Sequence, residues 1–410
     1  MKECDVLVVG AGPAGSSAAR AASMGGAKTV FIDKKGEVGK PVQCAGAVGA
    51  YLLPFLPFEI PKELLIWRID ELRFWADGIA INRRGGPWTS YAIDRSSFDS
   101  WLAQKAVEAG ADLRLETELV DLEIEDDFHA SKAIVKTGEG EEEAAFKALI
   151  AADGVDSKVL EELGVRNDSP IIGNAMSYEL ENVKLQAPHR DQLFFGDFAP
   201  SGYAYLFPIS RDRANIGVGS ISDEKEIEKC FEEFCELPQV KRQIQDSTKV
   251  KEKSGSVPFG YLADKCWYGN VLLAGDAATQ NIKPLVEGIL PAIICGSIAG
   301  ETAAKFLETG SPLAEYQESV QRKLGVIFRE SDRYIDLLDE LSHSTSEGRY
   351  LMMMGLCSNI FSVEDIKRLK DEDYAMLKRR LMGWKKSKMK RFMTEVQERF
   401  GILYLRLVSR

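Results

Sequence analysis

The stretch CDVLVVGAGPAGSSAARAASMGGAKTVFIDKK, residues 4–35, decides the fold. A short apolar run leads through a glycine-rich turn into an alanine-rich segment, and a second apolar run ends at Asp33. This order predicts a strand, a helix and a second, parallel strand. Gly10 permits the tight turn, Gly12 lets a pyrophosphate approach the backbone, and Gly15 lets the helix pack on the strand. Asp33 then lies where a carboxylate accepts hydrogen bonds from a ribose, which favours a dinucleotide site over a turn without ligand.

Composition sets the class of protein. With 410 residues, 45% of them hydrophobic and 28% charged, the chain is large enough for two or more globular cores. A net charge of -11 argues against general nucleic-acid binding, which needs a basic face. The first apolar run begins almost at residue 1, so we expect no cleaved signal and a cytoplasmic protein.

Two further expectations concern absences. The longest apolar candidate for a membrane span, GILPAIICGSIAG at 288–300, is expected to be too short to cross a bilayer. The seven cysteines include no pair at metal-binding spacing, so no metal site is expected.

Two later segments identify the dinucleotide. FKALIAADGVDSKV, 146–159, is a predicted strand that runs into Asp153, and residues 267–307 are a predicted strand ending at Asp276, then a turn and a long helix. They resemble the signatures of the large family of FAD-dependent oxidoreductases that includes the aromatic hydroxylases. By this resemblance the cofactor is FAD, Asp276 holds its ribityl and pyrophosphate region, and the long helix opens toward the flavin near Gly288 and Ile289.

The electron donor stays open. No second glycine motif follows a strand, so a dedicated nicotinamide domain is not expected. Leu160 stands where many hydroxylases that use NADPH carry an arginine. Ferredoxin, NAD(P)H and other reductants therefore all remain candidates.

Three other stretches narrow the family. GEVGKPVQCAGAVG (36–49), YAIDRSSFDSWLAQKAVEAGADL (91–113) and PSGYAYLFPISRDRANIGVG (200–219) look like those of the geranylgeranyl reductase family. These flavoenzymes hydrogenate the isoprenoid chains of archaeal membrane lipids and, in plants, of the chlorophyll precursor. The resemblance covers residues 1 to about 330. The glycine turn, the strand ends and the resemblance together place these residues at the cofactor: Gly10, Gly12, Ala14, Gly15, Asp33, Cys44, Ala45, Ala47, Arg95, Val120, Asp153, Asp276, Gly288 and Ile289.

The chain departs from the family pattern at three positions. The central aromatic residue of the third stretch is commonly Trp and is Tyr205 here, Ala47 replaces a common glycine, and Pro291 is expected to interrupt the start of the long helix. We expect the flavin site to tolerate these changes. The preferred lipid is not determined by them.

Tyr203, Tyr205 and Phe207 alternate along the third stretch, so all three rings lie on one face of a strand. The resemblance makes this face the wall of a pocket for an apolar chain, where rings also stabilise partial positive charge. The alternative is ordinary sheet core, since aromatic residues favour strands. Tyr203 and Tyr205 are candidate catalytic residues together with Cys44, which either lies beside the flavin as a proton donor or is a small buried hydrophobe.

The predicted architecture is an α/β protein: a Rossmann-like FAD domain of the aromatic-hydroxylase type, an antiparallel substrate sheet and a helical C-terminal region. The FAD domain is predicted at 1–70, 95–165 and 262–330, the substrate sheet at 71–94 and 166–261, and the helical region at 331–410.

The C-terminal region contains eight basic residues from Lys378 to Arg391, interleaved with apolar ones. One interpretation is a peripheral helix on the inner face of the cell membrane, which suits a lipid substrate. The others are a solvated helix that packs its apolar stripe on the protein, and a dock for an acidic electron-donor protein.

We therefore expect FAD-dependent reduction of isoprenoid C=C bonds in geranylgeranyl chains. Two other classes are compatible with the fold. One is an FAD monooxygenase or halogenase acting on an aromatic ring, although no WxWxIP stretch of the halogenase kind occurs. The other is a prenyl-binding module without catalysis, which would need none of the three flavin signatures.

Overall fold

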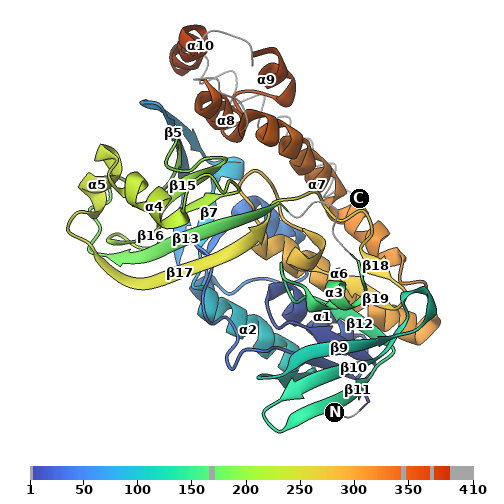
Figure 1. The fold of residues 1–410 in the computed structure, drawn as a ribbon. Helices are drawn as coiled ribbons and strands as arrows, with labels where there is room; N and C mark the ends of the chain where they lie inside the picture. Colours follow the sequence, from blue (N-terminus) through green and yellow to red (C-terminus); the bar gives the residue numbers. More distant parts are fainter. Residues whose placement is uncertain (1–2, 166–170, 343–347, 370–373, 388–410) are drawn as a thin grey trace.

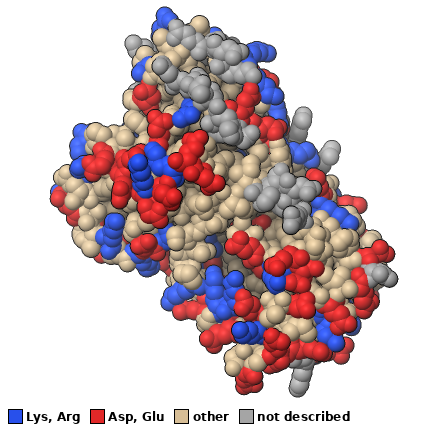
Figure 2. All heavy atoms as spheres, in the orientation of Figure 1, with Lys and Arg blue, Asp and Glu red and all other residues tan. Residues whose placement is uncertain are grey.

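The computed structural model describes residues 3–165, 171–342, 348–369 and 374–387. In Figure 1 the first strands and helices lie at the lower right, a large sheet lies at the left, and the last helices lie at the top. Figure 2 shows acidic side chains over much of one face with lysines and arginines between them, in keeping with the net charge of -11.

A six-stranded sheet forms the base of the cofactor half, in the order β18-β19-β12-β1-β2-β8. All neighbours are parallel except β18, which runs antiparallel to β19. The strands are β1 (Val6–Val9), β2 (Thr29–Ile32), β8 (Asp112–Arg114), β12 (Ala148–Ala151), β18 (Trp267–Tyr268) and β19 (Val271–Leu273). Residues of β1, β2, β12 and β19 are all buried, which explains why these strands are continuous apolar runs.

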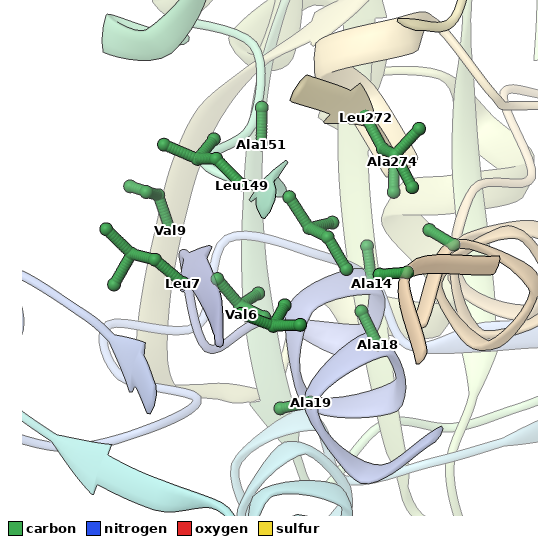
Figure 3. Packing of buried hydrophobic residues seen from close by; sticks show 14 of the residues in the cluster. Val6, Leu7, Val9, Ala14, Ala18, Ala19, Leu149, Ala151, Leu272 and Ala274 are labelled. Carbon is green, nitrogen blue, oxygen red and sulfur yellow. The ribbon is translucent and has the colours of Figure 1, made fainter. Parts of the chain in front are cut away.

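Two helices pack together over this sheet: α1 (Pro13–Met24) and α6 (Ile289–Thr309). Their contact is made of small residues, and Figure 3 shows Ala14, Ala18 and Ala19 of α1 against the sheet residues. A Cβ atom on Gly296 or Gly300 of α6 would lie 2.1 Å from a backbone oxygen of α1. The alanine-rich sequence of α1 is therefore a requirement of close helix packing.

The start of α6 differs from the expectation in one respect. The helix begins at Ile289 and contains Pro291, so this proline does not interrupt it. A proline in the first turn removes no hydrogen bond, because the first N–H groups of a helix have no partner within it.

The length of α6 also corrects an expectation. With 21 residues it is long and apolar enough to cross a membrane, contrary to the prediction that this run was too short. However, 83% of its most apolar window is buried inside the protein. The length and composition of α6 are therefore explained by its place in the core.

Two small sheets flank the cofactor half. One has the order β11-β10-β9 and inserts between β8 and β12, and the other has the order β3-β7-β4. Their strands are β3 (Ala47–Gly49), β4 (Trp67–Ile69), β7 (Ser90–Ala92), β9 (Glu118–Ile124), β10 (Ala130–Thr137) and β11 (Gly140–Ala145). Helix α2 (Arg95–Glu108) follows β7, and the short α3 (Lys158–Glu162) follows β12.

The second half is a seven-stranded sheet in the order β17-β13-β16-β15-β14-β5-β6. All pairs are antiparallel except β14 with β5. The strands are β5 (Glu71–Ala76), β6 (Ile79–Arg84), β13 (Ile172–Glu181), β14 (Arg190–Phe195), β15 (Gly202–Pro208), β16 (Arg213–Ser220) and β17 (Thr248–Pro258). Helices α4 (Ile227–Cys235) and α5 (Pro238–Ile244) follow β16.

The last helices run from the cofactor half to one end of this sheet (Figure 1): the first part of the longest one packs in the core of the cofactor half, and its end packs on the sheet with the helices that follow. They are α7 (Glu315–Ser342), α8 (Arg349–Cys357), α9 (Val363–Leu369) and α10 (Tyr374–Ser387). Methionines 352 to 354 of α8 share a hydrophobic cluster with Phe74, Leu193 and Tyr205 of the sheet. Helix α7 is continuous across position 330, where the sequence suggested a boundary.

The basic C-terminal segment is described only in part. Leu377 and Leu381 of α10 are buried in that same cluster, and Lys378 is bonded to Asp77 at 3.1 Å. This contact agrees with packing on the protein for the first turns of α10. The portion from 388 to Arg391 lies outside the described residues, so a membrane role for it stays a prediction.

Candidate active site

The turn between β1 and α1 leaves space for a phosphate group. A Cβ atom on Gly10 would lie 2.2 Å from the oxygen of Ala152, and one on Gly15 would lie 1.8 Å from the oxygen of Gly10, so both must be glycine. Gly12 has no neighbouring atom within 4 Å of its Cβ position. Its openness beside a helix N-terminus without a side-chain cap fits the pyrophosphate of FAD.

Asp33 is fixed beside this turn. Its Oδ2 accepts a hydrogen bond from the Ala11 N–H at 2.9 Å, and its Oδ1 accepts one from Lys35 N–H at 3.0 Å. The Thr117 N–H donates to the Asp33 carbonyl at 2.9 Å, which brings the segment that leads to Val120 on β9 to the same place. These contacts bring Asp33 and the segment before Val120 together, and their place at one end of a bound dinucleotide stays a prediction.

Asp153, just after the end of β12, makes its hydrogen bonds within the protein. Both oxygens of Asp153 are engaged with α3: one accepts from the Ser157 hydroxyl at 2.7 Å and the other from Val159 N–H at 3.1 Å. Burial raises the pKa of Asp153. Its side chain thus holds the start of α3, and a contact with FAD stays a prediction.

Asp276 lies at the junction of β19, α1 and α6. Burial raises the pKa of its carboxyl, and the positive charge of Arg95 lowers it in part. A Cβ atom on Gly275 would lie 2.9 Å from the Cβ of Ala14, and one on Gly288 would lie 3.6 Å from Oδ1 of Asp276. Nearby, the buried Oδ1 of Asn281 has no hydrogen-bond partner among the described residues, as expected if a ligand supplies one.

The loop that carries Cys44 is clamped between the two halves. The Ala45 oxygen accepts a hydrogen bond from the Asn215 side chain of β16 at 2.7 Å. The Gly46 N–H donates to the Cys44 sulfur at 3.4 Å, and a Cβ atom on Gly46 would lie 2.4 Å from the Ile93 oxygen. Ala47, whose side chain replaces the family's glycine, begins β3 without disturbing its pairing with Ala92.

Arg95 is the first residue of α2, as predicted from the sequence. Its guanidinium makes two hydrogen bonds to the carboxylate of Asp99, at 2.9 and 2.7 Å, and both side chains are largely buried. Burial acts to lower the pKa of Arg95, but Asp99 and the neighbouring Cys44 raise it overall. A fixed positive charge therefore lies next to Cys44 and within the electrostatic range of Asp276.

Two partly buried groups at the entrance to α6, Glu287 and Tyr51, escaped the sequence analysis. Glu287 accepts a hydrogen bond from the Tyr51 hydroxyl at 3.2 Å. Burial raises the pKa of the Glu287 carboxyl to about 7, and Tyr51 lowers it in part. The position of Glu287 directly before Gly288 was a signal that could have pointed to it.

The three rings of β15 lie on one face, as their spacing predicted. Tyr205 stacks on Phe207 with ring centroids 4.6 Å apart, and Tyr203 lies 6.4 Å from Tyr205. Glycines face the two tyrosines on β16, because Tyr205 pairs with Gly217 and Tyr203 with Gly219. A Cβ atom on Gly217 would lie 2.5 Å from the Tyr205 hydroxyl oxygen, so this glycine is what admits the ring.

The hydroxyl groups of the two tyrosines are already engaged. That of Tyr203 donates to the Leu285 oxygen at 2.8 Å, in the loop that leads to α6. Burial raises the pKa of both tyrosines, and Ser177 lowers that of Tyr205 in part. Both therefore stay protonated, and Tyr203 connects the aromatic face to the entrance of α6.

Comparison with known proteins finds a matching family model, relatives in sequence and similar solved structures. The family model of the FAD binding domain matches residues 74–283. A digeranylgeranylglycerophospholipid reductase of Methanococcus aeolicus is 33% identical over 349 residues, which cover 83% of this chain and 88% of that protein. The crystal structure of a geranylgeranyl bacteriochlorophyll reductase-like protein from Thermoplasma acidophilum is 25% identical, has a TM-score of 0.74 and covers 90% of this chain and 99% of that one.

A more distant structure, the myxobacterial chondrochloren halogenase, shares the fold. It is 19% identical, has a TM-score of 0.67 and covers 83% of this chain and 82% of that one. The predicted fold of the aromatic-hydroxylase type and the predicted cofactor, FAD, are confirmed by these matches. Identity of 33% over most of both chains goes further, because it confirms the resemblance stated from residues 36–49, 91–113 and 200–219. The chain belongs to the family of the digeranylgeranylglycerophospholipid reductases.

Proposed function

We propose that this flavoprotein oxidoreductase adds hydrogen across the C=C bonds of geranylgeranyl chains on glycerophospholipids. The observation that carries the proposal is the aromatic face of β15. Tyr203 connects this face to the entrance of α6, and Asn215 of the neighbouring strand β16, which pairs with Phe207, holds the Cys44 loop. An apolar chain held against this face lies between the two segments that line the flavin in this family. The relatives' names state the same substrate class for those proteins.

Addition of hydrogen to an alkene needs a hydride at one carbon and a proton at the other. Bound FAD in its reduced form supplies the hydride. The turn at Gly12, the side chain of Asp33 and the N-terminus of α6 hold and orient the cofactor. Tyr205 and Phe207 bind the chain, exclude water and stabilise positive charge that develops at the more substituted carbon.

The proton is assigned to Cys44. Its sulfur is oriented by the Gly46 N–H, and the charges of Arg95 and Lys253 are both near enough to interact with it. These cations stabilise the thiolate that remains after proton transfer, and water then restores the thiol. Tyr203 is a positioning residue in this scheme, because its hydroxyl group donates a hydrogen bond to the Leu285 oxygen.

The test is anaerobic. The holoenzyme is reduced with dithionite, a geranylgeranylated glycerophospholipid is added, and flavin absorbance and lipid mass are followed together. We expect reoxidation of the flavin in step with a gain of two hydrogen atoms per bond reduced. A flavin that stays reduced until oxygen enters would contradict the proposal and favour a monooxygenase of the same fold.

The proposal also covers the electron donor and the location of the enzyme in the cell. A reductase of this family needs a reductant and an isoprenoid lipid, and the donor is ferredoxin, NAD(P)H or another reductant. We propose a cytoplasmic enzyme that meets its lipid at the inner face of the membrane, with residues Lys378 to Arg391 as one means of contact. Sedimentation with anionic and neutral vesicles tests this placement.

A further inference from the structure

One face of the seven-stranded sheet changes character from strand to strand. Residues that pair directly across strands have their side chains on the same face. One row across the sheet is Phe207, Asn215, Glu179 and Lys251, and the next is Tyr205, Gly217, Ser177 and Lys253. Each row begins with an aromatic ring on β15 and ends with a lysine on β17, about 14 Å away over three strand spacings.

The lysine end of these rows opens into a cavity of about 150 Å³. It is enclosed by β13, β16 and β17 on one side and by the Cys44 loop and the start of α2 on the other. Its polar lining consists of Cys44, Asp94, Arg95, Glu179, Arg213, Asn215, Lys251 and Lys253. The loop spans this end of the face, because Gln43 packs on Gly255 and the Ala45 oxygen accepts from Asn215.

The three cations of the sheet that line this cavity converge on one acidic residue, Glu179. Arg213 pairs with Glu179 and reaches Glu181 at 3.5 Å. Lys251 lies 3.7 Å from Glu179 and 3.9 Å from Asp94, and Lys253 lies 3.7 Å from Glu179. One buried carboxylate, Glu179, is thus shared by three cations.

Lys253 is the most unusual of the three. Its side chain is only 6% exposed, and its closest partner is the neutral Oδ1 of Asn215 at 2.7 Å. Burial lowers the pKa of Lys253, and Glu179 raises it in part. A buried ammonium group with an amide as its nearest partner is costly unless another anion completes its surroundings.

We propose that this cavity binds the phosphate of the substrate's head group through Lys251, Lys253 and Arg213, and thereby orients the geranylgeranyl chain along the rows toward Tyr205. The inference rests on the proposed function and adds a binding site to it. A tetrahedral phosphate offers several acceptor oxygens and negative charge, which matches lysine and arginine donors that converge from neighbouring strands. The apolar chain then follows the same rows away from the charges.

A second ligand could place a phosphate in this cavity, since the phosphates of a nicotinamide donor present the same oxygens. The test therefore uses the FAD-loaded enzyme, two lipids and one donor. The lipids are a geranylgeranylated glycerophospholipid and the matching neutral geranylgeranylated glycerol. The donor is NADPH, and its rate of flavin reduction is measured without lipid.

The variants are Lys251→Met, Lys253→Met and, as a control, Lys249→Met. Each keeps a long side chain and removes one charge. Lys251 is half exposed, so its substitution has little effect on folding. Lys249 lies on the same strand but over the ring of Tyr178, at 3.9 Å, outside the cavity.

Binding is measured first, from the change in flavin absorbance when each lipid is added to the oxidised enzyme. We expect Lys251→Met and Lys253→Met to weaken phospholipid binding about tenfold or more, because a charge-assisted hydrogen bond is lost. The ratio of kcat/KM for phospholipid over neutral lipid should fall by the same factor. Lys249→Met should leave this ratio unchanged.

Other outcomes overturn the proposal in distinguishable ways. An equal loss for both lipids in Lys251→Met, which is not placed beside Cys44, would exclude a phosphate site in this cavity. Slower flavin reduction by NADPH with unchanged phospholipid binding would assign the cavity to the donor. A third outcome separates the two proposals. If the lysine variants weaken phospholipid binding as expected but the wild-type enzyme reduces neither lipid, the proposed reaction is refuted and the phosphate site is retained.

Discussion

Around the first turn the structure depends on residues without side chains, whereas the face formed by β15 and β17 depends on rings and ammonium groups, for which Gly217 makes room. Gly10, Gly15 and Gly296 lie where any Cβ atom would overlap a backbone oxygen at 2.2 Å or less. On β15 and β17 the site is instead shaped by the rings of Tyr205 and Phe207 and by the ammonium group of Lys253. Added atoms at these glycines should therefore disrupt the cofactor half, and removal of functional groups from β15 and β17 should impair the site on the sheet.

The largest effect is expected from Gly296→Val. A Cβ atom there would lie 2.1 Å from the Ala14 oxygen, so helices α1 and α6 must separate. We expect a loss of at least about 3 kcal/mol in the free energy of unfolding, seen as a lower Tm. Gly138→Ala is the control, because its Cβ position has no neighbour within 4 Å. An unchanged Tm for Gly296→Val would refute the close packing.

Gly12→Val sharpens the comparison within the same half. Its Cβ position is open, and its φ of -69° suits any residue, so the protein without FAD should melt as the wild type does. FAD affinity should fall about 100-fold or more, since the added atoms occupy the place of the pyrophosphate. Titration of the apoprotein with FAD measures this. Normal affinity would move the cofactor away from the turn.

Cys44→Ala tests the sheet-facing side of the site, where a functional group is removed. If the thiol supplies the proton, turnover should fall about 100-fold or more while FAD remains bound. Single-turnover reoxidation of the reduced flavin by lipid is the measurement, and Cys44→Ser is the variant that keeps a donor. Similar turnover in Cys44→Ala and the wild type would exclude the thiol as proton source.

Glu287, at the entrance to α6, should make stability depend on pH. Its pKa is raised from 4.5 to about 7 in the folded state, so the folded protein binds more protons than the unfolded chain between these values. Stability should therefore fall as pH rises from 5 to 8, by about 2 kcal/mol. Because Asp191, also with a pKa of about 7, contributes in the same direction, the measurement is the difference in Tm between wild type and Glu287→Gln. A difference in Tm that stays constant between pH 5 and pH 8 would contradict the assignment of this pH dependence to Glu287.

The smallest effect is expected from Tyr203→Phe, which keeps the ring and removes the hydroxyl. The hydrogen bond to the Leu285 oxygen is lost, at a cost of about 1 kcal/mol. Turnover should fall less than about tenfold, because this proton is held by a backbone oxygen and is not used in the reaction. A loss above 100-fold with FAD in place would make Tyr203 catalytic after all.

Much of the cofactor half was predictable because its signals are local. The turn at Gly10, Gly12 and Gly15, the strand that ends at Asp33 and the helix that begins after Gly288 each lie within one short stretch. Their chemistry follows from backbone geometry that neighbouring residues determine. The expectation for Pro291 was wrong because it did not consider that the first helical turn needs no N–H donors.

The sequence by itself determined the FAD fold, the family and the aromatic face of residues 203–207, since each depends on spacing within one segment. Only the tertiary structure decided what faces that strand. Sheet order places β17 beside β13, and so brings Lys253 into one row with Tyr205, 48 positions away in the chain. The tertiary fold also brings Tyr203 to Leu285, 82 positions away in the chain. Strand order and side-chain partners are set by packing between distant segments, which a pattern along the chain does not contain.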